Sequence, residues 1–174
     1  NGSVTIAYGN LVQNRATGDG GAIYAAGSLD VSNTLLANNV AGGTGGAIYA
    51  GGVSAIVNAT IADNTAAEGS GLYNAGVATI DNSILANNVG TDLYTATGAE
   101  TTLRSSLLAN VAQVGDTAFT LDRDYRSFLG VDPLLDANYR PTAGSLAINA
   151  GSNDLSRGAE TDLDGNARVV GLTI

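Results

Sequence analysis

A repeat of about 24 residues is the feature that most limits how this chain can fold. The sequence Gly-Gly-Ala-Ile-Tyr at residues 20–24 returns at residues 45–49, and shortened copies of it end at Tyr73 and Tyr94. Two apolar columns advance together by 25, 25, 24 and 23 residues, as subtraction of the residue numbers shows. They are Ile6, Val31, Ile56, Ile80 and Leu103, and Leu11, Leu36, Ile61, Leu85 and Leu108. Repeats of this length are typical of solenoids.

Within each repeat, polarity alternates with the period of a β-strand. Leu29, Val31 and Asn33 fall on one face of the strand, and Asp30 and Ser32 fall on the other. We therefore predict an all-β fold, a right-handed parallel β-helix (β-solenoid) of about six to seven coils with roughly 24 residues per coil. Residues 1–130 are expected to hold the repeats, and residues 131–174 to form a C-terminal continuation or tail packed on the same solenoid.

Composition narrows the classes of function. Aromatic residues are only 5 % of the chain, so Ala, Val, Ile and Leu must build the core. The absence of Cys and His excludes disulfides, thiolate metal sites and a histidine base. A net charge of −9 repels phosphate backbones, so we expect no nucleic-acid partner. The sequence has no apolar run long enough to span a bilayer.

Two further columns contain polar or aromatic side chains. Asn33, Asn58 and Asn82, continued by Ser105, are predicted to point inward and to form a structural ladder, each bonding turn backbone and its copies in adjacent coils. A second set should form an exposed aromatic row that stacks on itself, or that binds sugar rings or a neighbouring molecule. This row consists of Tyr24, Tyr49, Tyr73 and Tyr94.

The repeat motifs resemble those of a known group of surface proteins. A Gly-Gly-Ala-Ile block followed by a hydrophobic-x-x-Asn block is similar to the repeats of polymorphic outer-membrane proteins and related bacterial β-helix passengers, over residues 1–111. In that family the second block usually begins with Phe, where this chain has Leu or Ile. The resemblance implies the solenoid architecture and says little about activity.

Residues 131–171 resemble a different region, the tail that follows β-helix repeats in secreted bacterial proteins of the choice-of-anchor Q type. The matching motifs are Asp132-Pro133-Leu134, residues 144–151 and residues 161–168. This resemblance implies a secreted or surface-attached protein, extracellular in location, and it supplies no catalytic residues.

Asp162, Asp164 and Asn166 crowd oxygen atoms into one short segment. A calcium ion favours several oxygen ligands in such a loop. The EF-hand pattern fails because no Glu follows at the bidentate position, and an Asp-Gly turn explains the same residues without a metal. We therefore expect no cofactor, with a calcium ion bound by these three residues as the alternative.

Parallel β-helices include polysaccharide lyases and hydrolases, so a catalytic role is a further possibility for this chain. Hydrolysis needs two carboxyl groups about 5–10 Å apart, and we place Asp30 and Asp81 on either side of Ala55 at roughly that spacing. Asp122, Asp124 and Arg126 are secondary candidates. No groove-forming insertion accompanies them, so the chain is predicted not to be an enzyme.

Both ends read as strands without caps, and apolar strand edges favour pairing with another chain. We therefore expect a non-enzymatic extracellular structural protein, a surface or filament subunit that associates with other copies of itself. An adhesin or glycan-binding passenger is the first alternative, and a polysaccharide lyase or hydrolase is the second. The end-to-end contacts are assigned to Val4, Ile6, Val169, Val170, Leu172 and Ile174.

Overall fold

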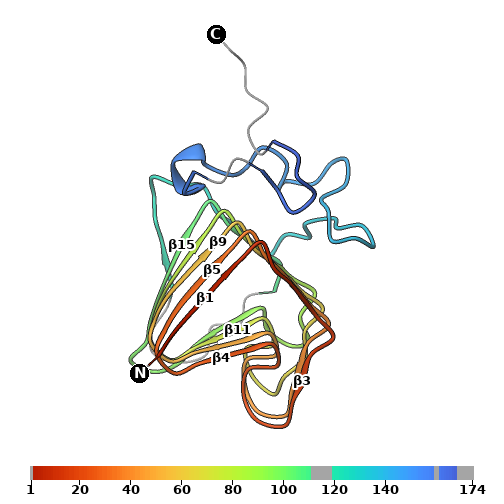
Figure 1. The fold of residues 1–174 in the computed structure, drawn as a ribbon. Coiled ribbons are helices and arrows are strands. Elements are labelled where there is room, and N and C mark those ends of the chain that lie inside the picture. Colours follow the sequence, from red (N-terminus) through yellow and green to blue (C-terminus); the bar gives the residue numbers. More distant parts are fainter. Residues whose placement is uncertain (1, 111–118, 159–160, 168–174) are drawn as a thin grey trace.

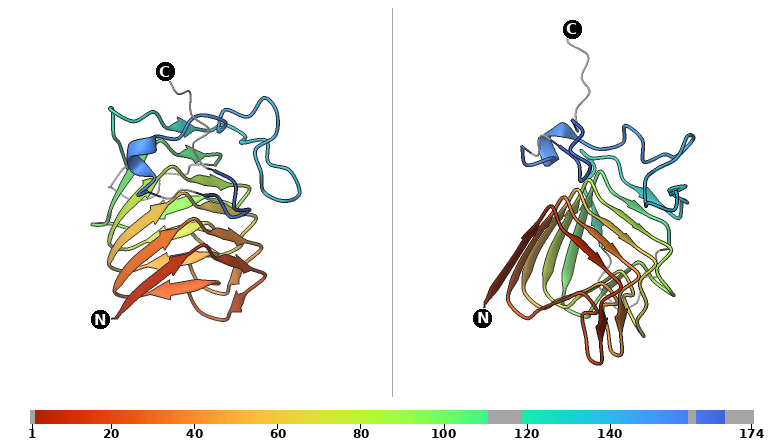
Figure 2. Two further views of the ribbon diagram at one scale, coloured as in Figure 1. Left: turned by 45° about the horizontal axis from the view of Figure 1, so that its top comes forward. Right: turned by 45° about the vertical axis from the view of Figure 1, so that its right-hand side comes forward.

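The protein is a parallel β-solenoid, as the sequence predicts. The computed structural model describes residues 2–110, 119–158 and 161–167. In Figure 1 the chain runs clockwise around a triangular cross-section, and Figure 2 shows the coils stacked with the N-terminal coil at one end. Since the chain recedes from the N-terminal coil as it turns clockwise, the solenoid is right-handed.

Each coil contributes strands to successive sheets, here named A to D in chain order. Sheet A is formed by the longest strands and holds β1 (Ser3–Ala7), β5 (Ser28–Ser32), β9 (Val53–Val57), β12 (Val77–Asp81), β15 (Glu100–Arg104) and β17 (Thr120–Leu121). Sheet B holds β2 (Asn10–Val12), β6 (Leu35–Ala37), β10 (Thr60–Ala62), β13 (Ile84–Ala86), β16 (Leu107–Leu108) and β18 (Phe128–Leu129).

The remaining strands are shorter and form two sheets, C and D, which follow sheet B around the coil. Sheet C pairs only β3 (Arg15–Ala16) with β7 (Val40–Ala41). Sheet D holds β4 (Ile23–Ala25), β8 (Ile48–Ala50), β11 (Leu72–Asn74) and β14 (Leu93–Thr95). Every pairing between these strands is parallel, and Ile6 lies opposite Val31, as the column spacing predicts.

The number of coils is lower than predicted. The chain makes about five turns of about 24 residues, not six to seven. After Leu108 only the two-residue strands β17 and β18 extend sheets A and B, and sheet D gains no strand beyond β14 in the described part of the chain. Residues 131–158 and 161–167 form turns, two antiparallel bridges and a short 3₁₀ helix, η1 (Asn153–Leu155), instead of a further coil.

Small aliphatic side chains fill the interior. Val31, Ile56, Ile80 and Leu103 are fully buried, and the second column behaves in the same way from Leu36 onward. In the described residues no aromatic side chain belongs to the central buried cluster, and Phe119 only packs against it. Stacking of equivalent residues therefore accounts for a core built without large rings.

Left-handed backbone forms two of the corners. The corner between sheets A and B, called the A–B corner, has positive φ angles of 53, 47, 54, 47 and 47° at Tyr8, Asn33, Asn58, Asn82 and Ser105. The next corner, after sheet B, repeats the pattern at Gln13, Asn38, Asp63 and Asn87. Asn tolerates this conformation better than most residues, which explains its recurrence at both corners.

The interior amide ladder differs from the predicted one. No hydrogen bond joins Asn33, Asn58 and Asn82 to each other within the described structure. Instead, six residues further along, Asn39 Nδ2 donates to Asn64 Oδ1 and Asn64 Nδ2 donates to Asn88 Oδ1, each over 2.9 Å. The predicted column lies at the A–B corner, where Asn58 and Asn82 bond to the C-terminal segment and Asn33 Oδ1 is buried without a partner.

Asp92 ends the interior ladder. Its Oδ1 accepts from Asn88 Nδ2 over 2.8 Å, and its Oδ2 accepts from the backbone N–H of Asn110 over 2.5 Å. Burial raises the pKa of the Asp92 carboxyl, although these hydrogen bonds oppose the shift.

Among the described residues, no helix has the length and apolar character that a membrane span requires.

Candidate functional site

The predicted tyrosine row exists and stacks on itself. Parallel register places Tyr24, Tyr49, Tyr73 and Tyr94 opposite one another on sheet D. Successive ring centroids lie 4.8, 5.5 and 4.8 Å apart, with interplanar angles of 13, 8 and 8°. Tyr24 is 56 % exposed, whereas the other three are half-buried. The faces of Tyr49 and Tyr73 are therefore covered by neighbouring rings, and these two residues offer mainly their edges to a partner.

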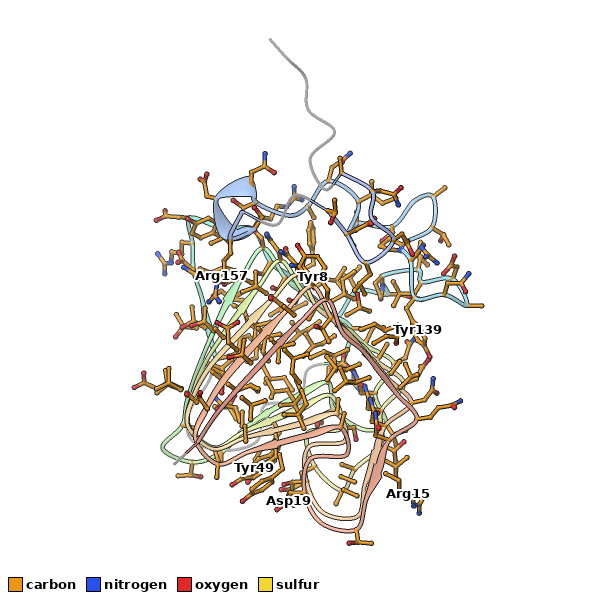
Figure 3. The ribbon with its side chains drawn as sticks, in the orientation of Figure 1. Tyr8, Arg15, Asp19, Tyr49, Tyr139 and Arg157 are labelled. Atoms are coloured by element: carbon orange, nitrogen blue, oxygen red, sulfur yellow. The ribbon has the colours of Figure 1, made fainter. Side chains whose placement is uncertain are left out.

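The surroundings of the row are acidic. Figure 3 shows Asp19 near Tyr49 on this side of the molecule. Burial raises the pKa values of the Tyr49 and Tyr73 hydroxyls, and neighbouring tyrosines and the carboxylates of Asp19 and Glu68 raise them further. The hydroxyls thus stay protonated at neutral pH. Asp19 itself is held in place, because its Oδ1 accepts from the backbone N–H and the hydroxyl of Thr44 over 2.7 and 3.0 Å.

The carboxylates weighed for catalysis do not form a pair. Asp30 lies opposite Ala55, but Asp81 lies opposite Val57, so the two acids are offset along the strand as well as separated by two coils. The predicted placement of both acids beside Ala55 is wrong, because Asp81 falls two residues beyond the position that continues the column of Asp30 and Ala55.

Each of these acids has an arginine partner. Asp81 is 2 % exposed and accepts from Arg104 Nε and Nη2 over 2.7 and 2.6 Å. Asp30 accepts from Arg157 Nη1 over 2.9 Å. These bonds hold coils and the C-terminal segment together, and each fixes its carboxylate beside a cation.

The secondary candidates lie on a turn at the sixth, incomplete coil. Asp122 Oδ1 accepts from the backbone N–H of Asp124 over 3.2 Å, and Asp124 is exposed. The guanidinium carbon of Arg126 lies 4.8 Å from the ring centroid of Phe128. The arrangement is a hydrogen-bonded turn beside a cation–π contact.

The candidate calcium loop is closed by its own hydrogen bonds. Asp162 Oδ1 accepts from the backbone N–H groups of Asp164 and Asn166 over 2.9 and 2.8 Å. The carboxylate of Asp164 binds Arg140, whose Nε donates over 2.8 Å. Residues 2–110, 119–158 and 161–167 contain no group of three or more acidic residues placed to hold a metal ion.

Of the predicted end-to-end contact residues, only those at the N-terminal coil can be located. Val4 and Ile6 pack against the core yet remain half-exposed, whereas the equivalent Leu29 and Val31 of the next coil are 2 % and 0 % exposed. Val169, Val170, Leu172 and Ile174 lie outside the described residues.

The C-terminal segment crosses the A–B corner and is bonded to three coils. Asn82 and Ser152 exchange two hydrogen bonds of 2.8 Å, and Asn58 Nδ2 donates to the carbonyl of Ser156 over 3.2 Å. Figures 1 and 2 show η1 lying against this corner, and Figure 3 places Arg157 beside it. On the other side of sheet B, Asn38 Nδ2 donates to the Tyr139 hydroxyl over 2.5 Å.

A cavity of about 480 Å³ opens between the A–B corner and this segment. The solenoid contributes Asn58, Asn82, Ser105 and Phe128 to its lining, and the segment contributes residues including Asn149 and Asn153. Sequence reasoning identified the corner column but missed this site, because no periodicity connects Asn82 with residues 149–153. The left-handed backbone of Asn149, φ 58°, is visible only in the structure, so the sequence offered no signal for this site.

Comparison of the chain with protein-family models, with curated proteins and with solved structures finds no match. What the site can do must therefore be argued from its own geometry.

Proposed function

We propose that this chain is a non-enzymatic structural β-solenoid of an extracellular or cell-surface protein, which associates with other copies of itself through its first coil. The observation that carries the proposal is the half-exposed state of Val4 and Ile6, in positions that are buried in strands β5, β9, β12 and β15 of the same sheet. Strands β1 and β2 each have a described partner on one side only. A further parallel coil laid on this edge would pair backbone groups and cover both side chains.

The disposition of the acids supports a structural role over a catalytic one. Asp81 and Asp30 are bound to arginines, and Asp92 ends the interior amide ladder. The arginine partners of Asp81 and Asp30 are 23 and 127 residues away, and Asp92 joins Asn88, four residues away, to Asn110, 18 residues away. A scaffold needs such contacts, whereas a lyase or hydrolase needs carboxylates that are free to meet substrate.

The surface location rests on the two resemblances and on charge. The repeats are similar to those of polymorphic outer-membrane proteins, and residues 131–171 are similar to a choice-of-anchor Q tail. A net charge of −9 with only 7 basic residues suits a soluble, exposed protein better than one that binds nucleic acid. The head-to-tail contact that we propose would place residues 167–174 of one copy on the first coil of the next.

Sedimentation of the full chain and three variants tests the association. The full chain should form concentration-dependent assemblies, and both Ile6→Lys and a chain lacking residues 167–174 should remain monomeric. Thr5→Lys is the matched control, because Thr5 lies on the same strand but is exposed on the outer face, so it should assemble like the parent. A full chain that stays monomeric at high concentration would overturn self-association, and assembly of the truncated chain would overturn the C-terminal contact.

A glycan-binding adhesin is the second candidate, favoured by one observation. Tyr24 is the most exposed member of the aromatic row and has no tyrosine stacked on its N-terminal side in the described coils. A sugar ring could pack there on an aromatic face. Glycan binding that is lost in Tyr24→Ala but kept in Tyr73→Ala would support this candidate.

A further inference from the structure

The cavity beneath the C-terminal segment has the character of a ligand site. Its volume of about 480 Å³ falls in the range of small-molecule pockets. We propose that this cavity binds a neutral polyhydroxylated molecule, of the chemical class and size of a mono- or disaccharide. The inference is independent of end-to-end association and of the tyrosine row.

The walls of the cavity are fixed before any ligand arrives. The two hydrogen bonds between Asn82 and Ser152 hold the segment against the fourth coil, and the bond from Asn58 to Ser156 holds it against the third. Leu155, between them, is only 7 % exposed. Such preorganisation lowers the entropy cost of binding.

Several lining side chains have no partner within the described structure. Asn149, Asn153, Ser105 and Asn58 are lining residues, the first two of them exposed, and the amides of Asn149 and Asn153, the hydroxyl of Ser105 and Oδ1 of Asn58 make no hydrogen bond within the described structure. Other lining groups are already engaged: Ser83 Oγ donates to the carbonyl of Asp81 over 2.7 Å. The free groups therefore form a distinct set that faces a ligand or water.

The chemistry of this set selects the ligand class. An amide presents both a donor and an acceptor, and a hydroxyl does the same, which matches adjacent hydroxyl groups of a sugar. None of the described residues that line the cavity is ionisable, so a charged ligand would lose hydration without gaining an ion pair from them. Ile84 and Phe128, both half-buried, supply apolar surface for the C–H face of a sugar ring.

Ligand-detected saturation-transfer NMR on the full chain tests the proposal. The probes are maltose, cellobiose and lactose, with galacturonate as an anionic comparator. We expect saturable binding of at least one neutral sugar and weaker binding of galacturonate. Asn149→Gly and Asn153→Ala should each weaken the neutral sugar about fivefold, the equivalent of one lost hydrogen bond.

The control is chosen to match the backbone as well as the side chain. Asn149 has φ 58°, so glycine removes its amide without strain. Asn87 is exposed, has the same φ of 58° and lies outside the cavity, so Asn87→Gly should bind like the parent. The proposal is wrong if no neutral sugar gives a saturable signal, in which case the cavity holds water only, or if the signal survives both cavity substitutions.

Discussion

Asn82 and Ser152, 70 residues apart, are joined by two hydrogen bonds. The Asn82 amide nitrogen donates to the Ser152 carbonyl, and the Ser152 N–H donates to the Asn82 amide oxygen, each over 2.8 Å. The Asn82 amide thus bonds both the N–H and the C=O of Ser152, as the backbone of a neighbouring strand would. A corner of the solenoid thereby fixes a segment that has no strand of its own.

Asn82→Gly should release this segment while leaving the coils intact. Loss of two hydrogen bonds removes about 1–2 kcal/mol of local stability, and glycine accepts the left-handed φ of 47°. Hydrogen exchange of residues 147–156 should become faster, with little change in sheet A. Asn87→Gly is the control for the glycine backbone itself. Equal exchange in both variants would show that the Asn82–Ser152 pair does not hold the segment.

Two of the arginine–aspartate pairs, Arg104–Asp81 and Arg157–Asp30, should differ in their contribution to stability. Asp81 has a side chain only 3 % exposed, so Arg104→Ala leaves a buried carboxylate without its cation and should cost about 2–3 kcal/mol. The Arg157–Asp30 pair is 46 % and 45 % exposed, and Arg157→Ala should cost less than about 1 kcal/mol. Urea denaturation measures both. Equal losses would contradict the difference in burial.

A double substitution checks the cause of that loss. Val57 occupies the position opposite Asp81 in the preceding coil, so Val is compatible with the site. Asp81→Val combined with Arg104→Ala should therefore recover most of the stability lost in Arg104→Ala alone, because no charge remains buried. A double variant as unstable as the single one would mean that the arginine contributes through packing.

The sequence predicts contacts that follow its period and misses those that do not. The spacing of Ile6 and Val31 predicts their pairing, because a solenoid translates equivalent residues onto each other. In contrast, Asn82 and Ser152 belong to segments with different patterns, and nothing periodic relates them. The cavity lies at this non-periodic contact, and the sequence could not indicate it.

The interior ladder shows that the sequence does not reveal which of two adjacent asparagines points inward. Asn38 and Asn39 are adjacent, and either could be the inward residue. The structure gives Asn38 the left-handed corner and places Asn39 inside, 0 % exposed. Alternation of polarity within a strand does not extend through a corner, because a left-handed residue changes the direction in which the next side chain points.

The correct ladder can be identified by comparing Asn64 with Asn33. Asn64 donates to Asn88 and to the carbonyls of Leu36 and Ala62, so Asn64→Ala should lower the free energy of unfolding by about 3 kcal/mol. Asn33 Oδ1 is buried and has no hydrogen-bond partner, so Asn33→Gly should cost less than about 1 kcal/mol. Thermal unfolding compares them. If Asn33→Gly lowered the stability as much as Asn64→Ala, the ladder predicted from the sequence, at Asn33, Asn58 and Asn82, would be the stabilising one.

Asp92 should give the solenoid a specific pH dependence. Burial raises its pKa above the ordinary 3.8, so between these two values the folded chain keeps a proton that the unfolded chain releases. Folding is therefore favoured most below the unfolded pKa, and this contribution is lost as pH rises towards the folded value. Subtracting the unfolding free energy of Asp92→Asn from that of the parent isolates the effect, because the other acids contribute equally to both chains. The difference, measured by urea denaturation from about pH 3 to 7, should fall with rising pH and then level off. A difference that increases with pH would mean that the carboxylate is stabilised by its hydrogen bonds from Asn88 and Asn110 more than it is destabilised by burial.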